Sequence, residues 1–244
     1  MSENEAAAAD EAVGQDEKLL FGASDRVELI STIILSMAAI FTAWAAFQSA
    51  KWSGEQATNF SRAGATRTES TRFDTRAGQL AAIDVSVFAA FADAVNSDIR
   101  DGLIDAGPGV PFAAVEGTLS GFWFERVRDE FRPAFEAWLD VFFTDRANAP
   151  PTPFAMEEYV VADAIEADQL QQEADEFASA AGQANQNSDD YVLTVVAFAL
   201  VLFFGGVSSK LTKQGNRYLT LVTAVVLFVG ATWTVFSLPK ILPF

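Results

Sequence analysis

The chain has 244 residues with neither Cys nor His, and its 33 acidic and 16 basic residues give a formal net charge of −17. The lack of Cys and His excludes disulfides, thiolate chemistry and the commonest general base and metal ligand, so we expect no enzymatic activity and no cofactor. The acidic balance argues against nucleic acid as a partner, because affinity for phosphate backbones comes from Lys and Arg.

The first 24 residues are predicted to be a disordered acidic tail. Residues 2–15 are rich in Ala and Glu and show no periodicity. Lys18 and Arg26 are the basic side chains of residues 1–28, whereas a cleavable signal peptide needs a basic start. We therefore expect no signal peptide here.

Three apolar runs, 29–47, 191–207 and 219–238, contain no Asp, Glu, Lys or Arg. Each is about long enough to cross a hydrocarbon core of ~30 Å at ~1.5 Å per residue. The sequence therefore predicts a multi-pass protein of the cell membrane. The predicted segments are a first transmembrane helix over 25–50, a soluble domain over 51–188, a second transmembrane helix over 189–208, a loop over 209–218, a third transmembrane helix over 219–238 and a tail over 239–244.

The loop between the second and third spans predicts the orientation. It carries Lys210, Lys213 and Arg217 and no acidic residue, and short basic loops stay in the cytoplasm. We therefore expect a cytoplasmic N-terminus and an extracytoplasmic domain over 51–190. Lys51 and Arg62 follow the first span and oppose this orientation, but long domains cross membranes largely regardless of charge.

The soluble domain is predicted to be helical. Pro and Gly interrupt it mainly near 105–111 and 148–153, which leaves helix candidates ending near Arg100, over 119–144 and over 156–187. Pro133 is expected to kink the second candidate or to open a new helix. Its aromatic stripe is interpreted as core rather than as a ligand pocket. The fold class is therefore all-α, with three transmembrane helices and a membrane-proximal helical bundle inserted between the first and second.

Small residues follow one another at steps of three and four from the first span into the soluble domain. Such a stripe lets two helix backbones approach closely. We expect it to pack against another helix of the domain or a second copy; the alternative is a polar, flexible stretch. The predicted seam comprises Ala39, Ala43, Ala46, Ala50, Gly54, Ala57, Ser61 and Gly64.

Polar and aromatic residues stand where the first span ends and the second begins. We expect them to lie at one membrane boundary, with the aromatic rings as interface anchors. They either cap and hydrate the two helix ends or form a cluster that binds a cation or a polar head group. This predicted cluster comprises Gln48, Trp52, Glu55, Asn185, Asn187, Asp189 and Tyr191.

These boundary motifs also carry a resemblance. The strings W-x-x-F-Q-S-x-K-W-S-G-E-Q-A at 44–57, A-N-x-x-S-D-x-Y-V-L at 184–193 and F-A-x-V-L-F-F-x-G at 198–206 are similar to a group of prokaryotic membrane proteins known only as hypothetical. The resemblance covers under a sixth of the chain. It implies a three-span membrane protein and no activity.

Three functions follow as hypotheses. The leading one is a non-enzymatic envelope scaffold or interaction protein in contact with membrane lipid, which self-associates or binds another membrane protein. The second is an accessory or pore-forming subunit of a transport system; against it, the three runs carry no ionisable residue. The third is an enzyme that uses paired carboxylates.

Overall fold

The structure, a computed structural model, describes residues 3–105 and 109–242, with side chains from Glu28 onward. Within these ranges the chain is helical and has no strand, which confirms the all-α class. The elements are α1 (Glu3–Arg100), α2 (Leu119–Phe124), α3 (Arg132–Thr144), the 3-10 helix η1 (Pro153–Ala155), α4 (Ala162–Ser208) and α5 (Gln214–Ser237).

Helices α1, α4 and α5 each contain a stretch that is long and apolar enough to cross a membrane. These stretches coincide with the three runs found in the sequence. By length and composition, the structure thus has the three candidate spans that the sequence predicted.

Helix boundaries differ from the expectation in two places. Helix α1 begins at Glu3, so the segment predicted as a disordered tail is helical from that residue; Ala and Glu are strong helix formers. The candidate over 119–144 forms two helices, and Pro133 stands in the first turn of α3, where its missing N–H costs no hydrogen bond.

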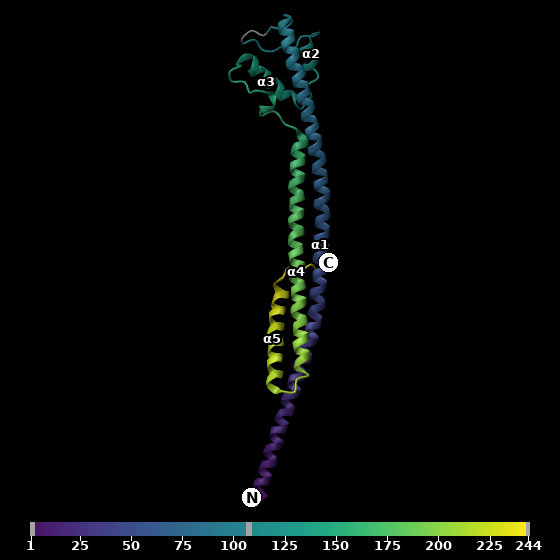
Figure 1. Ribbon diagram of the computed structural model, residues 1–244, viewed down its shortest axis with the longest axis vertical. Coiled ribbons are helices and arrows are strands. Elements are labelled where there is room, and N and C mark those ends of the chain that lie inside the picture. Colours follow the sequence, from purple (N-terminus) through teal and green to yellow (C-terminus); the bar gives the residue numbers. More distant parts are fainter. Residues whose placement is uncertain (1–2, 106–108, 243–244) are drawn as a thin grey trace. The chain divides into compact units, whose positions relative to one another are not determined.

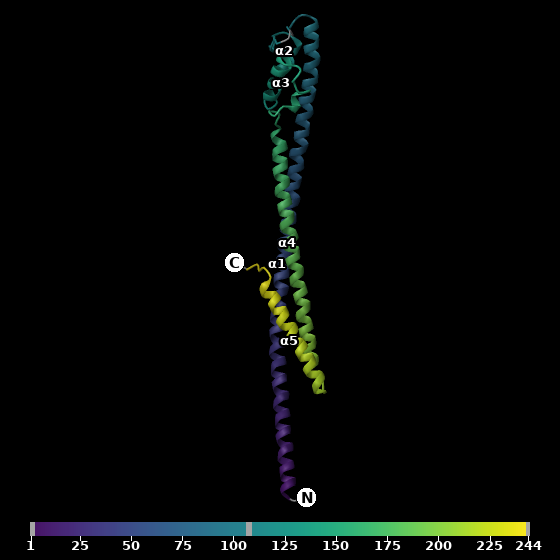
Figure 2. The ribbon, with the colours of Figure 1, turned by 90° about the vertical axis from the view of Figure 1, so that its left-hand side faces the viewer.

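The chain divides into two compact units, which are described separately. Unit 1 comprises residues 1–61 and 177–244, and it contains parts of α1 and α4 together with α5. Figures 1 and 2 show α5 running back beside α4. Phe41 stacks on Phe198 with ring centroids 5.7 Å apart. The buried core of unit 1 is formed by Ala38, Ala45, Tyr191, Phe198, Val201, Ala231 and Val235.

Unit 2 comprises residues 62–176 and has an aromatic core. Helices α2 and α3 lie beside the end of α1 in Figure 1. Phe91 of α1 meets Phe135 of α3 edge to face, with centroids 4.8 Å apart. The core confirms the interpretation of the aromatic stripe as packing. It contains Phe91, Val95, Val127, Phe131, Ala134, Phe135, Trp138 and Leu139.

The packed face of α1 lies beside the predicted seam, not on it. All eight predicted seam residues are exposed, and a Cβ added to Gly54 or Gly64 would meet nothing within 4 Å. In unit 1 the buried side chains include Ala38 and Ala45, and in unit 2 they recur every seven residues, as in a coiled coil. The unit 2 positions are Ala63, Ser70, Ala77, Asp84, Phe91 and Asp98.

The seam prediction is therefore wrong for packing within the chain. Small residues occur on several faces of α1, so their spacing alone does not select the buried one. The larger side chains and the contacts with α4 determine which face is buried. One such contact is the hydrogen bond that the Ser70 hydroxyl donates to the Ala167 carbonyl of α4 at 2.8 Å. Packing of the exposed stripe against a second copy stays a prediction.

Candidate functional site

The two boundary motifs do meet in unit 1. The Ser188 hydroxyl of α4 donates to the Ser49 carbonyl of α1 at 3.1 Å. The same oxygen lies 3.1 Å from Ser49 Oγ and 2.9 Å from Ser53 Oγ. The end of the first apolar run and the start of the second therefore lie side by side.

The segment that follows α5 completes this site. Gln48 is fully buried; its Nε2 donates to the Ile241 carbonyl at 3.1 Å, and the Ile241 N–H donates to its Oε1 at 3.0 Å. The Pro239 carbonyl accepts two further hydrogen bonds, from Trp52 Nε1 and from the Tyr191 hydroxyl, each at 3.1 Å. We call this arrangement the polar junction; it consists of Gln48, Ser49, Trp52, Ser53, Ser188, Tyr191 and residues 239–241.

The carboxylates of the predicted cluster do not join the polar junction. Glu55 accepts a hydrogen bond from Asn59 at 3.2 Å, and Asp189 accepts one from Asn185 at 3.2 Å, each within its own helix. Both carboxylates belong to exposed residues, and Asn187 is half-buried on α4. The expectation that Gln48, Glu55 and Asp189 form one cluster therefore finds no support in these bonds.

Helix geometry explains the separation. Glu55 follows Gln48 by seven residues, which is about 10 Å along the axis. Residues 239–241 contact α1 at Gln48 and Trp52. Sequence reasoning missed the three serines and the C-terminal segment. The sequence predicted a tail from residue 239 onward, but nothing in it showed which side chains would bind the Pro239 carbonyl.

The hydrogen bonds of the polar junction indicate a structural role. Its bonds join amide, hydroxyl and indole groups to backbone atoms and hydroxyls to one another, and its amine, Lys240 Nζ, donates to the Phe236 carbonyl at 2.8 Å. Buried polar groups that are paired in this way fix one arrangement of the helices around them. The junction therefore holds residues 48–53 of α1 and 188–191 of α4 against each other and against the segment that follows α5.

Unit 2 contains a buried ion pair. Arg128 donates from Nε and Nη2 to the two oxygens of Asp84 at 3.2 and 2.8 Å, and it also pairs with Glu130. The Tyr159 hydroxyl donates to Asp84 at 3.3 Å. The hydrogen bond to Asp84 raises the pKa of Arg128, and burial raises the pKa of Tyr159. The network ties the segments on both sides of α3 to α1.

A second buried carboxylate, that of Asp98, accepts a hydrogen bond at the start of α2. The Ser120 N–H donates to Asp98 Oδ2 at 2.7 Å, and the Gly121 N–H donates to the Thr118 hydroxyl at 3.0 Å. Burial raises the pKa of Asp98, but hydrogen bonds from Ser120 and Leu119 outweigh it, so the pKa lies below its ordinary value. Gly121 admits no side chain, since a Cβ there would lie 2.4 Å from the Val115 carbonyl.

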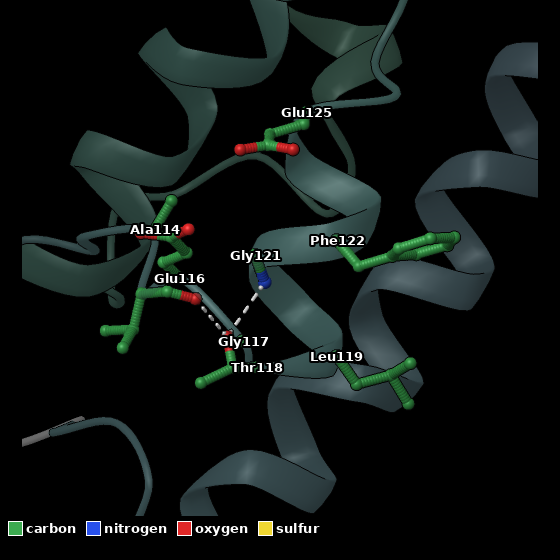
Figure 3. A pocket seen from close by; sticks show the side chains of 9 residues that line it. Ala114, Glu116, Gly117, Thr118, Leu119, Gly121, Phe122 and Glu125 are labelled. Atoms are coloured by element: carbon green, nitrogen blue, oxygen red, sulfur yellow. Dashed lines mark hydrogen bonds between the residues drawn. The ribbon is translucent and has the colours of Figure 1, made fainter.

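A hollow of about 570 Å³ lies where the turn before α2 meets this helix (Figure 3). Glu116 and Glu125 border it, and small and apolar residues that include Thr118, Leu119 and Phe122 complete its wall. Gly117 adopts a φ of +85°, which allows the turn. The two carboxylates give the hollow a negative charge. Its lining residues do not pair a nucleophile with a base.

The side of unit 2 formed by α1 and α2 carries an exposed apolar surface. A hollow of about 290 Å³ is lined by Ile83 of α1 and Trp123 of α2. Leu119 and Phe122 extend the surface and point to the same side of α2 in Figure 3. Arg126 stacks over the Phe122 ring at 3.4 Å. We call this the apolar surface of unit 2; it consists of Ala82, Ile83, Ser86, Val87, Leu119, Phe122 and Trp123.

No family model, curated protein or solved structure matches the chain. The resemblance of the boundary motifs to prokaryotic three-span membrane proteins accordingly stays a prediction.

Proposed function

We propose that the chain is a multi-pass integral membrane protein, without enzymatic activity, whose unit 2 binds another membrane protein. The three apolar helices support membrane integration. The apolar surface of unit 2 carries the binding proposal. It lies outside the apolar runs, yet Ile83 and Leu119 are each more than half exposed. Such surfaces on otherwise polar domains mark interaction sites.

The composition of this surface suits a protein partner. Trp123 and Arg126 belong to the residue types that dominate binding energy at interfaces, and Phe122 belongs to a type enriched there. The hollow beside Trp123 offers a socket for one apolar side chain of the partner.

Charge favours a different protein over a second copy. Residues 62–176 contain no Lys, and their acidic side chains outnumber their Arg more than twofold. Two such units would repel each other at close approach, whereas a partner with Lys and Arg around an apolar ridge would be attracted. We therefore propose a partner with a basic rim. The positive charge of the loop with Lys210, Lys213 and Arg217 favours a cytoplasmic loop, which would place unit 2 and its binding surface on the extracytoplasmic side.

A photo-crosslinking amino acid at position 122, in native membranes, tests this function. We expect one adduct with a membrane protein, weaker at high salt and lost when Trp123→Asp is added. A crosslinker at Ile165, which is also exposed but on α4, is the matched control and should give no adduct. An adduct of two copies of the 26.3 kDa chain, or equal adducts from both positions, would overturn the proposal.

A further inference from the structure

A groove of about 510 Å³ runs between α4 and α5 in unit 1. Its volume lies within the range typical of small-molecule sites. Leu193 and Val226 line its apolar part, and the small residues Ala197 and Gly230 leave it open. A Cβ built at Gly230 meets nothing within 4 Å, so the space is not filled by the chain itself. Because these residues belong to the candidate spans, hydrocarbon rather than water is the expected filling.

One end of the groove is polar and offers acceptors. Three polar residues line the groove there: Asp190, Thr194 and Thr234. Thr194 already donates its proton to the Asp190 carbonyl at 2.8 Å, and Thr234 donates to the Gly230 carbonyl at 3.0 Å. Both hydroxyls have therefore donated their protons and can act toward a ligand only as acceptors. Among the ion pairs of the described residues, none involves Asp190.

We propose that this groove binds one membrane lipid whose head group carries an ammonium. The acyl chain lies along Leu193, Ala197 and Gly230. The ammonium donates to Asp190, since a donor with positive charge matches an end that holds only acceptors. Binding in this form rests on the proposed insertion of α4 and α5 in a membrane.

Phosphatidylethanolamine and phosphatidylglycerol with identical acyl chains distinguish the contribution of the head group from that of the acyl chains. They are added to the purified full chain in detergent, and retained lipid is counted by native mass spectrometry. We expect one phosphatidylethanolamine per chain, retained about tenfold better than phosphatidylglycerol. Asp190→Asn should remove this preference. Asp189→Asn is the matched control, because Asp189 is bonded to Asn185 outside the groove, and it should keep the preference.

A second pair of variants tests the apolar part. Gly230→Leu fills the groove and should abolish retention of both lipids, while Ala199→Leu on an exposed face of α4 should not. Equal retention of the two lipids, or retention unchanged by Gly230→Leu, overturns the proposal. A dimer that Gly230→Leu disrupts would show that a second copy of the chain, and not a lipid, occupies the groove. This result would also overturn the proposal.

Alkaline carbonate extraction distinguishes this proposal from the proposed function. Chain recovered in the soluble fraction would refute membrane integration itself. Chain that stays in the membrane fraction but shows no lipid preference would refute the lipid site alone, and the adduct at position 122 would be unaffected.

Discussion

The side-chain amide of Gln48 pairs with the backbone of Ile241 at both of its ends, through hydrogen bonds of 3.1 and 3.0 Å. The pair joins the end of the first apolar run to the segment after the third, 193 residues away. Because Gln48 is fully buried, neither end of the amide has water as a substitute. The Gln48–Ile241 pair therefore specifies how the C-terminal segment closes unit 1.

Gln48→Met keeps the length of the side chain and removes both hydrogen bonds. We expect a loss of about 2–4 kcal/mol in the free energy of unfolding, because two backbone groups of Ile241 become unpaired. Thermal unfolding in detergent measures this loss. Gln183→Met, at an exposed position of α4, is the control and should change the midpoint little. Equal midpoints for the two variants would show that the pair contributes nothing.

The packing register of α1 predicts opposite results at neighbouring alanines. Ala45 is fully buried and Ala46 is exposed. Ala45→Leu should destabilise unit 1 by about 1–3 kcal/mol through overpacking, and Ala46→Leu should leave the monomer stable. Thermal unfolding checks both. A change of oligomer size in Ala46→Leu alone would instead identify the exposed stripe as a contact between copies.

The buried ion pair predicts a large loss of stability in one variant and its partial rescue by a second substitution. Arg128→Met leaves the Asp84 carboxylate, 1% exposed, without its guanidinium, and we expect a loss of about 3–5 kcal/mol. Adding Asp84→Leu should restore much of it, since no buried charge then remains. Arg67→Met, which breaks the exposed pair with Asp175, is the control and should cost less than about 1 kcal/mol. A double variant no more stable than Arg128→Met would contradict this account.

Asp98 predicts a dependence of stability on acid. Its pKa is lower in the folded chain than its ordinary value of 3.8, so folding is favoured most when the carboxylate is ionised. This stabilisation is fully present above the unfolded pKa and is lost as pH falls through the folded pKa. Below pH 3.8 the stability of unit 2 should therefore drop more steeply in the native chain than in Asp98→Asn. The variant should also lose about 1–2 kcal/mol at neutral pH.

Far-UV circular dichroism during acid titration, with matched ionic strength, measures this difference. Parallel acid transitions for the native chain and Asp98→Asn would show that the Ser120 and Leu119 bonds do not favour the charged form.

Much of the fold follows from the sequence because long apolar runs and helical periodicity are strong local signals. The three apolar runs predict the candidate spans of α1, α4 and α5. Pro133 is expected either to kink a helix or to open a new one, and it stands in the first turn of α3. The aromatic stripe predicts the core of unit 2, because large side chains at steps of three and four identify one face.

The candidate site was less predictable because it depends on pairing between distant segments. Trp52 and Tyr191 could be recognised as boundary residues, but their shared acceptor, the Pro239 carbonyl, carries no side-chain signal. The same holds for α1, where Ala45 and Ala46 are chemically identical and only the partner helix determines which is buried.

The central claim, that the apolar helices cross a membrane with residues 51–190 outside, is tested most directly by labelling. A single Cys is placed at position 148 or 214 of a chain that has none of its own. An impermeant thiol reagent is then applied to intact cells. We predict labelling at 148 and, at 214, labelling only after the membrane is opened. Labelling at 214 with protection at 148 would invert the orientation, and equal labelling at both positions would contradict the crossing of α4.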